Sequence, residues 1–334
     1  MTLSPREAGA FTEKILAEVE RAVVGKRSAL ELVLVGMLAR GHILLEDYPG
    51  LAKTLAARSF ARAVGLRLAR VQFTPDLMPA DVTGSSIYDP AARSLVFQLG
   101  PIFANLVLGD EINRATPKTQ AALLEAMAEQ QVTVDGTTRA LPEPFIVMAT
   151  QNPIEFEGTY ALPEAQLDRF LVRLQLGYPE HGDEVEMLER RLARRSERVE
   201  LDEVVDRERF SAMQDAVEQV HVAPGIVEYV VSIVESTRRH PSVELGSSPR
   251  GSLALVGAAR ARAVVCQRDF VTPEDVKALA VPCLAHRISL RPELWVRGAK
   301  SANIIDECLA TVPTPATDGE ALGAGTPAAP EDPT

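Results

Sequence analysis

The sequence predicts an α/β domain built on a parallel sheet, followed by a second domain made of helices. Short apolar runs alternate with helical patterns in the first half of the chain, and two of these runs end in polar residues typical of a nucleotide site. Beyond residues 179–182 the spacing of apolar residues is helical to about Ala310. We therefore expect N-terminal helices over residues 1–40, a core over 41–178 and a helical domain over 179–310.

The first elements are expected to be two helices and a strand. Residues 12–23 have the spacing of an amphipathic helix, and residues 26–40 predict a second helix whose apolar residues cover much of its surface. An apolar strand begins at His42 and leads through a turn into a helix over residues 53–64. Residues 67–73 alternate between apolar and polar side chains, which predicts the next strand.

A turn-rich segment follows this second strand. Residues 74–100 contain several prolines and glycines around two apolar patches, 86–88 and 94–99, which predicts an insertion with a hairpin. A loop of this length inside a compact domain is usually functional.

The remaining strands of the first domain are short and apolar. Residues 105–109 and 144–150 have the composition of buried parallel strands, and Asp135-Gly136 predicts a hairpin between them. Thr116 as N-cap and Pro117 at the first helical position open a helix before this hairpin. The domain closes with a short helix and a last strand, over residues 162–170 and 171–176.

The run from Ile43 to Thr54 has the build of a triphosphate-binding loop, the Walker A element. Backbone N–H groups of such a turn point at phosphate oxygens, a Lys contributes a positive charge, and a Thr hydroxyl completes a Mg²⁺ shell. The strict pattern places glycines where this chain has Asp47 and Ala52, so the motif alone also fits an ordinary Pro-Gly turn. The candidate cofactor-binding residues are Pro49, Gly50, Leu51, Ala52, Lys53 and Thr54.

Two acids follow the predicted strand over residues 105–109, as in a Walker B element. At the carboxyl end of a parallel strand, Asp110 can hold Mg²⁺ together with Thr54, while Glu111 polarises the attacking water. Two adjacent acids also occur in solvated loops, but their separation from Lys53 favours a site for ATP and Mg²⁺. Asn152, just beyond the next buried strand, can bond the attacking water or the γ-phosphate, although an Asn-Pro turn is the alternative.

Composition and charge narrow the possible partners and location. The chain has 334 residues, is 46% hydrophobic and carries a formal net charge of −11, which disfavours nucleic acid and anionic membranes as partners. It contains no apolar stretch of transmembrane length and no secretory signal, so we expect a cytoplasmic protein without membrane insertion. The arginines at 190, 191, 194 and 195 alternate with glutamates, which predicts a salt-bridged solvent face.

Two further features concern the second half of the chain. Cys266, Cys283 and Cys308 are odd in number and lack C-x-x-C spacing, which argues against disulfides or a zinc site. Residues 311–334 contain five prolines and neither Lys nor Arg, so we expect a disordered tail. Within the helical domain, Ser248 as N-cap and Pro249 in the first turn predict a helix start beside Arg250.

Six ordered motifs resemble those of the MoxR family of AAA+ ATPases, over about residues 10–309. They are Lys53-Thr54 after a Pro-Gly turn, residues 72–84 (Gln-Phe-Thr-Pro-Asp-Leu-Met-Pro through Asp-Val-Thr-Gly), Gly100-Pro101-Ile102-Phe103, residues 110–115 (Asp-Glu-Ile-Asn-Arg-Ala), residues 149–153 (Ala-Thr-Gln-Asn-Pro) and Ser248-Pro249-Arg250.

The resemblance implies a doubly wound P-loop AAA+ core followed by an all-α lid, assembled into a hexameric ring with ATP between subunits. It further implies that Asn152 is sensor 1, that Arg169 is an arginine finger offered in trans, and that Arg250 is sensor 2, reaching from the lid to the γ-phosphate. Val24 and Gly25 match the segment of the family that lies near the adenine ring of ATP. At the next position the family more often has Gln, where this chain has Lys26. From the residues alone, an intrachain pair with an acid is the alternative for Arg169.

The implied activity is Mg²⁺-dependent ATP hydrolysis that remodels or matures a client protein in a chaperone-like manner. Family members often work beside a partner with a von Willebrand factor A domain, and we take residues 75–100 as the candidate contact for client or pore. Two alternatives remain open: a nucleotide-gated scaffold with negligible hydrolysis, and a chelatase-type motor subunit for metal insertion. Asp47 is the main reason for the first, since a carboxylate close to the phosphates costs binding unless it turns away or faces a cation.

Overall fold

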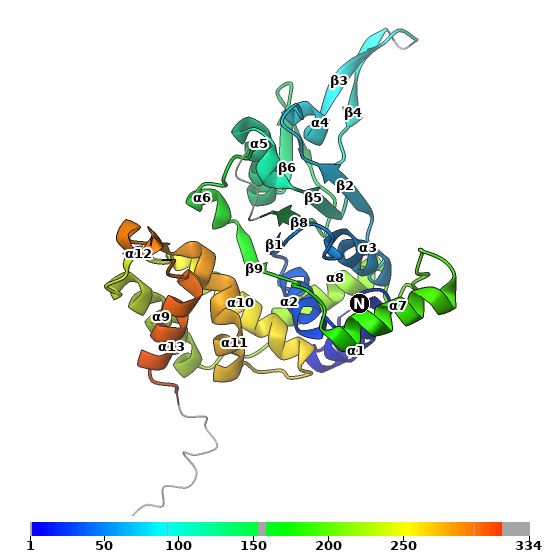
Figure 1. Ribbon diagram of the computed structural model, residues 1–334. Coiled ribbons are helices and arrows are strands. Elements are labelled where there is room, and N and C mark those ends of the chain that lie inside the picture. The colour runs from blue at the N-terminus through cyan, green and yellow to red at the C-terminus, as the bar shows by residue number, and fades with distance from the viewer. Residues whose placement is uncertain (1, 92, 153–157, 297, 316–334) are drawn as a thin grey trace, which may run out of the picture.

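The protein consists of an α/β core, a helical region packed against it, and a long hairpin that projects from the core (Figure 1). The computed structural model describes residues 2–91, 93–152, 158–296 and 298–315. Five parallel strands form the central sheet in the order β2-β5-β8-β1-β9. These strands are β1 (His42–Glu46), β2 (Leu68–Gln72), β5 (Leu106–Asp110), β8 (Ile146–Gln151) and β9 (Phe170–Leu174).

The middle strands of the sheet are buried on both faces, as their continuous apolar runs predicted. Successive side chains of β1 alternate between two apolar clusters: Ile43 and Leu45 belong to one, and Leu44 belongs to the other. β8 lies between β1 and β5, so the polar residues that end these three strands share one edge of the sheet. The predicted α/β core is confirmed.

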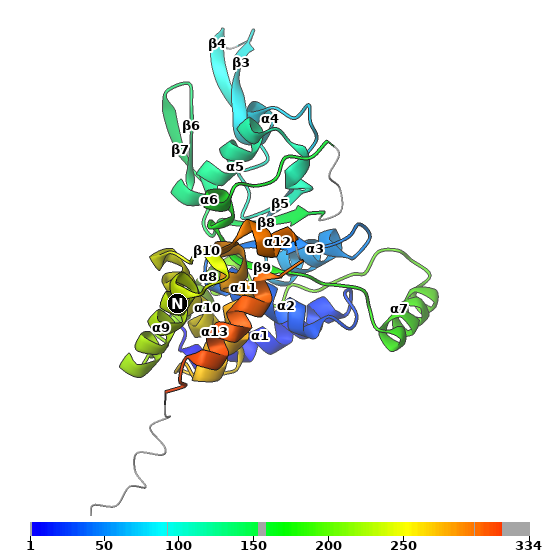
Figure 2. The ribbon, with the colours of Figure 1, turned by 60° about the vertical axis from the view of Figure 1, so that its left-hand side comes forward.

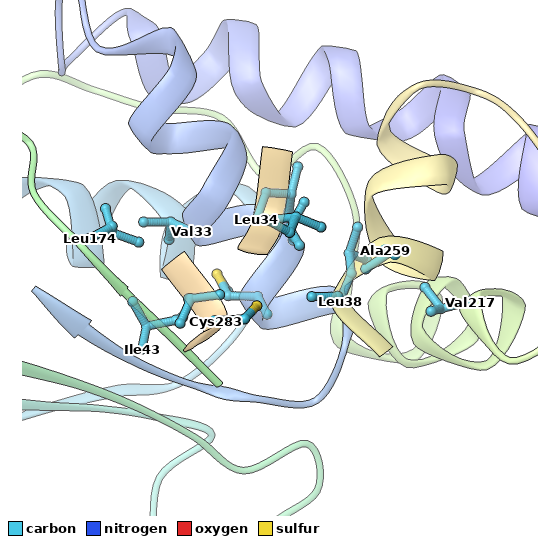
Figure 3. Packing of buried hydrophobic residues seen from close by; sticks show 14 of the residues in the cluster. Val33, Leu34, Leu38, Ile43, Leu174, Val217, Ala259 and Cys283 are labelled. Atoms are coloured by element: carbon cyan, nitrogen blue, oxygen red, sulfur yellow. The ribbon is translucent and has the colours of Figure 1, made fainter. Parts of the chain in front are cut away.

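Helices cover both faces of the sheet. Figure 3 shows Val33 of α2, Ile43 of β1 and Cys283 of α11 (Pro273–Leu284) in one cluster of buried apolar side chains. One apolar layer therefore joins the N-terminal helices, the sheet and the helical region. The helices of the first half are α1 (Pro5–Glu20), α2 (Arg27–Leu38), α3 (Lys53–Ala63), α4 (Pro79–Thr83), α5 (Pro117–Glu129) and α6 (Glu164–Leu167), with a 3₁₀ turn η1 (Ile112–Arg114).

The region after the core is helical, as predicted, and also contains a small antiparallel ladder. In that ladder Val243 pairs with Leu290. The elements are α7 (His181–Arg194), α8 (Arg207–Val217), α9 (Pro224–Arg239), β10 (Val243–Leu245), α10 (Pro249–Val265), α11 (Pro273–Leu284), η2 (Ala285–Arg287), β11 (Ser289–Leu290), α12 (Pro292–Val296) and α13 (Ser301–Thr311).

Local start signals explain where several of these helices begin. The Ser248 hydroxyl accepts a hydrogen bond from the backbone N–H of Arg250 at 3.2 Å, which caps α10 as its sequence predicted. Thr116 holds the N-cap position of α5 in an extended conformation, and Pro117 follows it. α7 has no buried residue, and of its predicted ion pairs the structure shows that of Arg190 with Glu186.

Two hairpins extend from the core where turn signals predicted them. β3 (Gly84–Asp89) and β4 (Ser94–Leu99) form a ladder that projects away from the sheet in both views (Figures 1 and 2). β6 (Gln131–Val134) and β7 (Thr137–Ala140) are joined by Asp135-Gly136, whose φ angles of 51° and 71° suit a tight hairpin turn.

The three cysteines are free thiols, of which Cys283 and Cys308 are buried and Cys266 is exposed. Burial raises the pKa of the Cys283 thiol to about 12. None of the helices in the described part of the chain combines the length and the apolar composition that a membrane crossing requires. The predicted disordered tail begins at the end of α13, and its residues 316–334 lie outside the described residues.

Candidate nucleotide-binding site

The loop between β1 and α3 surrounds a cavity of about 400 Å³ at the carboxyl edge of the sheet. Gly50 has φ = +85°, a conformation that glycine adopts readily, and Ala52 has φ = +53° at the N-cap of α3. The loop therefore keeps the left-handed turn of a phosphate-binding loop although Ala52 replaces a glycine. The cavity is lined by Pro49, Gly50, Leu51, Ala52, Lys53, Thr54, Leu55, Arg58, Asp110, Glu111 and Asn152.

Lys53 folds its ammonium group back onto the loop. Its Nζ donates hydrogen bonds to the backbone oxygens of Asp47 at 2.6 Å and Tyr48 at 2.9 Å. Burial lowers the pKa of Lys53, while the negative charges of Asp47, Asp110 and Glu111 oppose that shift. A cation in the first turn of a helix, where backbone N–H groups are free to bind anions, is well placed to bind a polyanion.

Thr54 and Asp110 form a pair of oxygen donors that fits Mg²⁺. Thr54 Oγ1 lies 3.4 Å from Asp110 Oδ2, and both residues line the cavity. A hydroxyl and a carboxylate are the hard ligands that Mg²⁺ uses beside phosphate oxygens and water. The Thr150 hydroxyl donates to the other Asp110 oxygen at 2.7 Å, which fixes the carboxylate toward Thr54.

Two residues of β2 hold the acids, a role that the sequence did not predict for them. Arg70 donates to Asp110 Oδ2 from Nε at 3.1 Å and from Nη2 at 2.7 Å, and Gln72 Nε2 donates to Glu111 Oε2 at 2.8 Å. Because β2 pairs with β5 in register, Gln72 lies opposite Asp110. The polar residues of the predicted strand over residues 67–73 could have indicated such a role. The sequence alone, however, does not show that this strand pairs with the strand that carries the acids.

Asn152, the predicted sensor 1, lines the same cavity as the two acids, and its role stays a prediction. It follows β8, which pairs with β5, and its side chain is buried. The Asn113 amide donates to its backbone oxygen at 3.4 Å. The Pro of the alternative Asn-Pro turn, at position 153, lies outside the described residues.

Asp47 turns away from the cavity, which removes the main objection to the loop. Its carboxylate is 4% exposed and accepts hydrogen bonds from the backbone N–H groups of Leu176 at 2.5 Å and Gly177 at 3.2 Å. The side chain therefore joins the end of β1 to the segment that follows β9. Charge-assisted hydrogen bonds of this kind are stronger than neutral ones.

Val24 and Gly25 are not among the residues that line the cavity, and Gly25 lies against Asp183 of α7. Gly25 has φ = +70°, a backbone conformation that favours glycine. The neighbouring Lys26 donates from Nζ to the backbone oxygen of Tyr178 at 2.5 Å. Their predicted contact with adenine stays a prediction.

Arg250 contacts Asp168, the residue next to Arg169, and neither arginine is among the residues that line the cavity. Arg250 Nη1 lies 3.4 Å from Asp168 Oδ2, and Arg287 binds the other oxygen of the same carboxylate. Arg169 Nη1 instead donates to the backbone oxygen of Leu124 at 2.6 Å. Among the described residues no carboxylate pairs with Arg169, so the alternative of an intrachain ion pair is not observed.

Comparisons with known proteins identify the two parts of this fold. Residues 42–172 match the model of the ATPase family associated with various cellular activities (AAA), and residues 235–308 match the model of the AAA lid domain. A solved structure, a putative ATPase from Cytophaga hutchinsonii, has a TM-score of 0.86 at 36% identity and covers 92% of this chain and 96% of its own.

Two protein relatives match nearly the whole chain. "Uncharacterized protein YeaC" of Bacillus subtilis (strain 168) is 50% identical over 90% of this chain and 94% of its own length. "Chaperone MoxR1" of Mycobacterium tuberculosis is 42% identical over 91% of this chain and 82% of its own length. The matched core and lid thus place the chain in the AAA+ class. The chain belongs to the MoxR family of these ATPases.

Replacing Asp47 by Gly, which moves the loop toward the strict pattern, is expected to destabilise the protein. The change leaves the N–H groups of the buried Leu176 and the partly buried Gly177 without this acceptor, at a cost of about 2–4 kcal/mol in the free energy of unfolding. Thermal and urea unfolding measure this loss. Asp47→Asn keeps one acceptor and should lose less. An Asp47→Gly protein of unchanged stability that binds ATP more tightly would mean that the carboxylate faces the phosphates.

Proposed function

We propose that this protein binds ATP with Mg²⁺ in the cavity beside Lys53 and hydrolyses it to remodel client proteins. The observation that carries the proposal is the convergence of Lys53, Thr54, Asp110 and Glu111 on one cavity at the carboxyl edge of a parallel sheet. Thr54 and Asp110 would hold Mg²⁺, which when bound neutralises the charge that develops on the phosphates.

Each residue around the cavity has a distinct role in this proposal. Backbone N–H groups from Gly50 to Thr54 bind phosphate oxygens, and Lys53 leaves the loop carbonyls for the outer phosphates. Glu111 accepts hydrogen bonds from Gln72 and pairs with Arg114 at 3.1 Å, which orients its carboxylate as the group that polarises water. Asn152 would position that water from the neighbouring strand.

The separation of the arginines from the cavity supports an assembly in which subunits complete each other's sites. Phosphoryl transfer is favoured by positive charge beside the γ-phosphate, but Arg250 pairs with Asp168, and the neighbouring Arg169 donates to the Leu124 backbone oxygen. In a hexameric ring, the two arginines of one subunit would face the cavity of the next. Arg169 then acts as the arginine finger and Arg250 as sensor 2.

The projecting hairpin and the relatives support a chaperone-like role. The hairpin of β3 and β4 projects away from the sheet (Figures 1 and 2). It exposes large apolar side chains, among them Tyr88 and Leu95, and none of its described residues lines the cavity. Exposed apolar surface of this kind suits contact with another polypeptide. A relative with 42% identity is named as a chaperone, and a partner with a von Willebrand factor A domain belongs to the same proposal.

Two alternatives receive less support. The scaffold without hydrolysis depended on an Asp47 carboxylate close to the phosphates, and that carboxylate is engaged elsewhere. A chelatase-type motor would share the same cavity and differ in its partner, so the relative named as a chaperone favours protein remodelling.

Substitutions at Lys53 and Glu111 separate binding from hydrolysis. Lys53→Ala is expected to abolish ATP binding, because the loop loses its point charge for the phosphates. Glu111→Gln should bind ATP normally but hydrolyse it about 100-fold more slowly, because the water loses its base. Fluorescent-nucleotide titration and phosphate release measure the two effects. A Glu111→Gln protein that hydrolyses at the wild-type rate would remove Glu111 from the mechanism.

Mixing two inactive variants tests whether Arg169 acts in trans. Arg169→Ala retains the cavity and Lys53→Ala retains the arginine, so a mixture should recover hydrolysis in rings that contain both. The hydrolysis rate per subunit of the wild-type protein should also rise with protein concentration and then saturate, because active sites form only in assembled rings. Sedimentation measured at the same concentrations reports how much of the protein is assembled. A mixture that stays inactive over a wide range of ratios, with rings formed, contradicts the trans assignment.

The hairpin can be tested with an unfolded polypeptide. Replacing Tyr88 and Leu95 by Ser removes exposed apolar surface while the ladder hydrogen bonds remain. We expect weaker binding of carboxymethylated α-lactalbumin in fluorescence anisotropy, with unchanged basal ATPase. The matched control replaces Leu192, an exposed apolar residue of α7, by Ser. Equal loss in both variants, or loss in neither, argues against a hairpin-specific contact.

A further inference from the structure

The turn that carries Arg169 is held by a buried guanidinium group of the lid. Arg287 belongs to η2, directly after α11, and 2% of its side chain is exposed. Its Nη2 donates to the backbone oxygen of Phe170 at 2.6 Å, and its Nη1 donates to the backbone oxygen of Asp168 at 3.0 Å and to the Asp168 carboxylate. One lid side chain thus binds both residues that flank Arg169.

Two further lid residues reach the same turn. Burial lowers the pKa of His286 to about 3, so its ring is neutral, and the contact of Nε2 with the backbone oxygen of Phe170 at 3.0 Å requires that Nε2 donates. Arg250, at the start of α10, contacts the second Asp168 oxygen. The start of α10 and the turn η2 that follows α11 therefore both contact the segment from Asp168 to Phe170.

Arg169 itself has fewer constraints than its neighbours. Its Nη1 donates to Leu124, whereas its Nε is buried and has no hydrogen-bond partner among the described residues. Leu124 belongs to α5 of the core, while the backbone on both sides of Arg169 is bound to the lid. The position of this arginine is consequently set by the lid through the backbone.

Burial makes the contact between Arg287 and Asp168 hard to exchange for another. Burial lowers the pKa of Arg287, and the Asp168 carboxylate opposes that shift. A buried guanidinium that loses its carboxylate partner is strongly destabilised, so the pair is expected to move as one body. A rotation of the lid that breaks the apolar contacts elsewhere would carry the Arg169 turn with it.

We propose that Arg287 and Asp168 form a clamp through which the lid positions Arg169 for the nucleotide of the neighbouring subunit. The proposal rests on the proposed function, because it takes Arg169 to act in trans. Arg287 and Asp168 are positioning residues and touch no reacting atom. The lid of one subunit thereby regulates hydrolysis in the cavity next to it, in addition to any effect on its own nucleotide.

Asp168→Asn tests the clamp with little change of shape. The variant keeps the backbone carbonyls that Arg287 binds but removes the charge between Arg287 and Arg250. We expect wild-type ATP binding, an unchanged KM, and a kcat about 10- to 100-fold lower, because Arg169 is misplaced. Arg287→Lys, which keeps the buried charge but loses the planar fork, is a second variant with the same expected behaviour.

Mixing experiments identify the site on which the clamp acts. A mixture of Asp168→Asn with Lys53→Ala should recover hydrolysis, because the second protein supplies an intact clamp to the intact cavity of the first. A mixture of Asp168→Asn with Arg169→Ala should stay slow, because neither protein supplies a correctly placed arginine. Recovery in the second mixture, or a wild-type rate of Asp168→Asn alone, overturns the proposal.

A matched control separates positioning from stability of the lid. Asp275 is another carboxylate held by two lid arginines, Arg262 and Arg268, and it lies away from the Arg169 turn. Asp275→Asn should lower the temperature of unfolding and leave kcat unchanged at temperatures where the protein is folded. A loss of kcat equal to that of Asp168→Asn overturns the clamp.

If Arg169→Ala and Lys53→Ala fail to complement each other, the trans function itself fails. If only the Asp168→Asn and Lys53→Ala mixture fails, the clamp alone is wrong.

Discussion

The candidate site depends on the parallel pairing of β8 between β1 and β5. This order brings three strand ends, from different parts of the chain, to one edge of the sheet. A shift of register by one residue in a parallel pair would turn Asp110 to the opposite face and separate it from Thr54. The buried apolar side chains of the strands prevent that shift, because each face packs against its own cluster. The apolar core thus determines the geometry of the polar site.

Electrostatics at the cavity follow from the same arrangement. Asp110 receives hydrogen bonds from Thr150 of β8 and from Arg70 of β2, so its charge is compensated from both neighbouring strands. Glu111 is held by Gln72 in a similar way. Buried or half-buried carboxylates are costly without such partners. The fold therefore stabilises two adjacent acids at a position where they would otherwise repel each other.

Much of the fold could be predicted from the sequence, because its signals are local. Apolar runs, the Asp135-Gly136 turn and the caps at Thr116 and Ser248 depend on neighbours within a few residues. The role of Asp47 could not be predicted in this way, since its partners lie 129 and 130 positions away in the chain. The same holds for Arg70 and for the grouping of Arg250 with Asp168. Local sequence patterns therefore predict which residues contribute chemical groups to a site, whereas the contacts between these groups depend on tertiary packing.

The contact between lid and core combines two kinds of interaction with different mechanical consequences. A continuous apolar cluster joins the N-terminal helices, one face of the sheet and the helices α8 to α11 (Figure 3). Apolar contacts are not directional, so small sliding movements between packed helices exchange one set for another at low cost. The fork of Arg287 on Asp168 and Phe170 has one satisfactory geometry. A movement of the lid is therefore absorbed by the apolar layer and transmitted where directional bonds concentrate, which is the turn that carries Arg169.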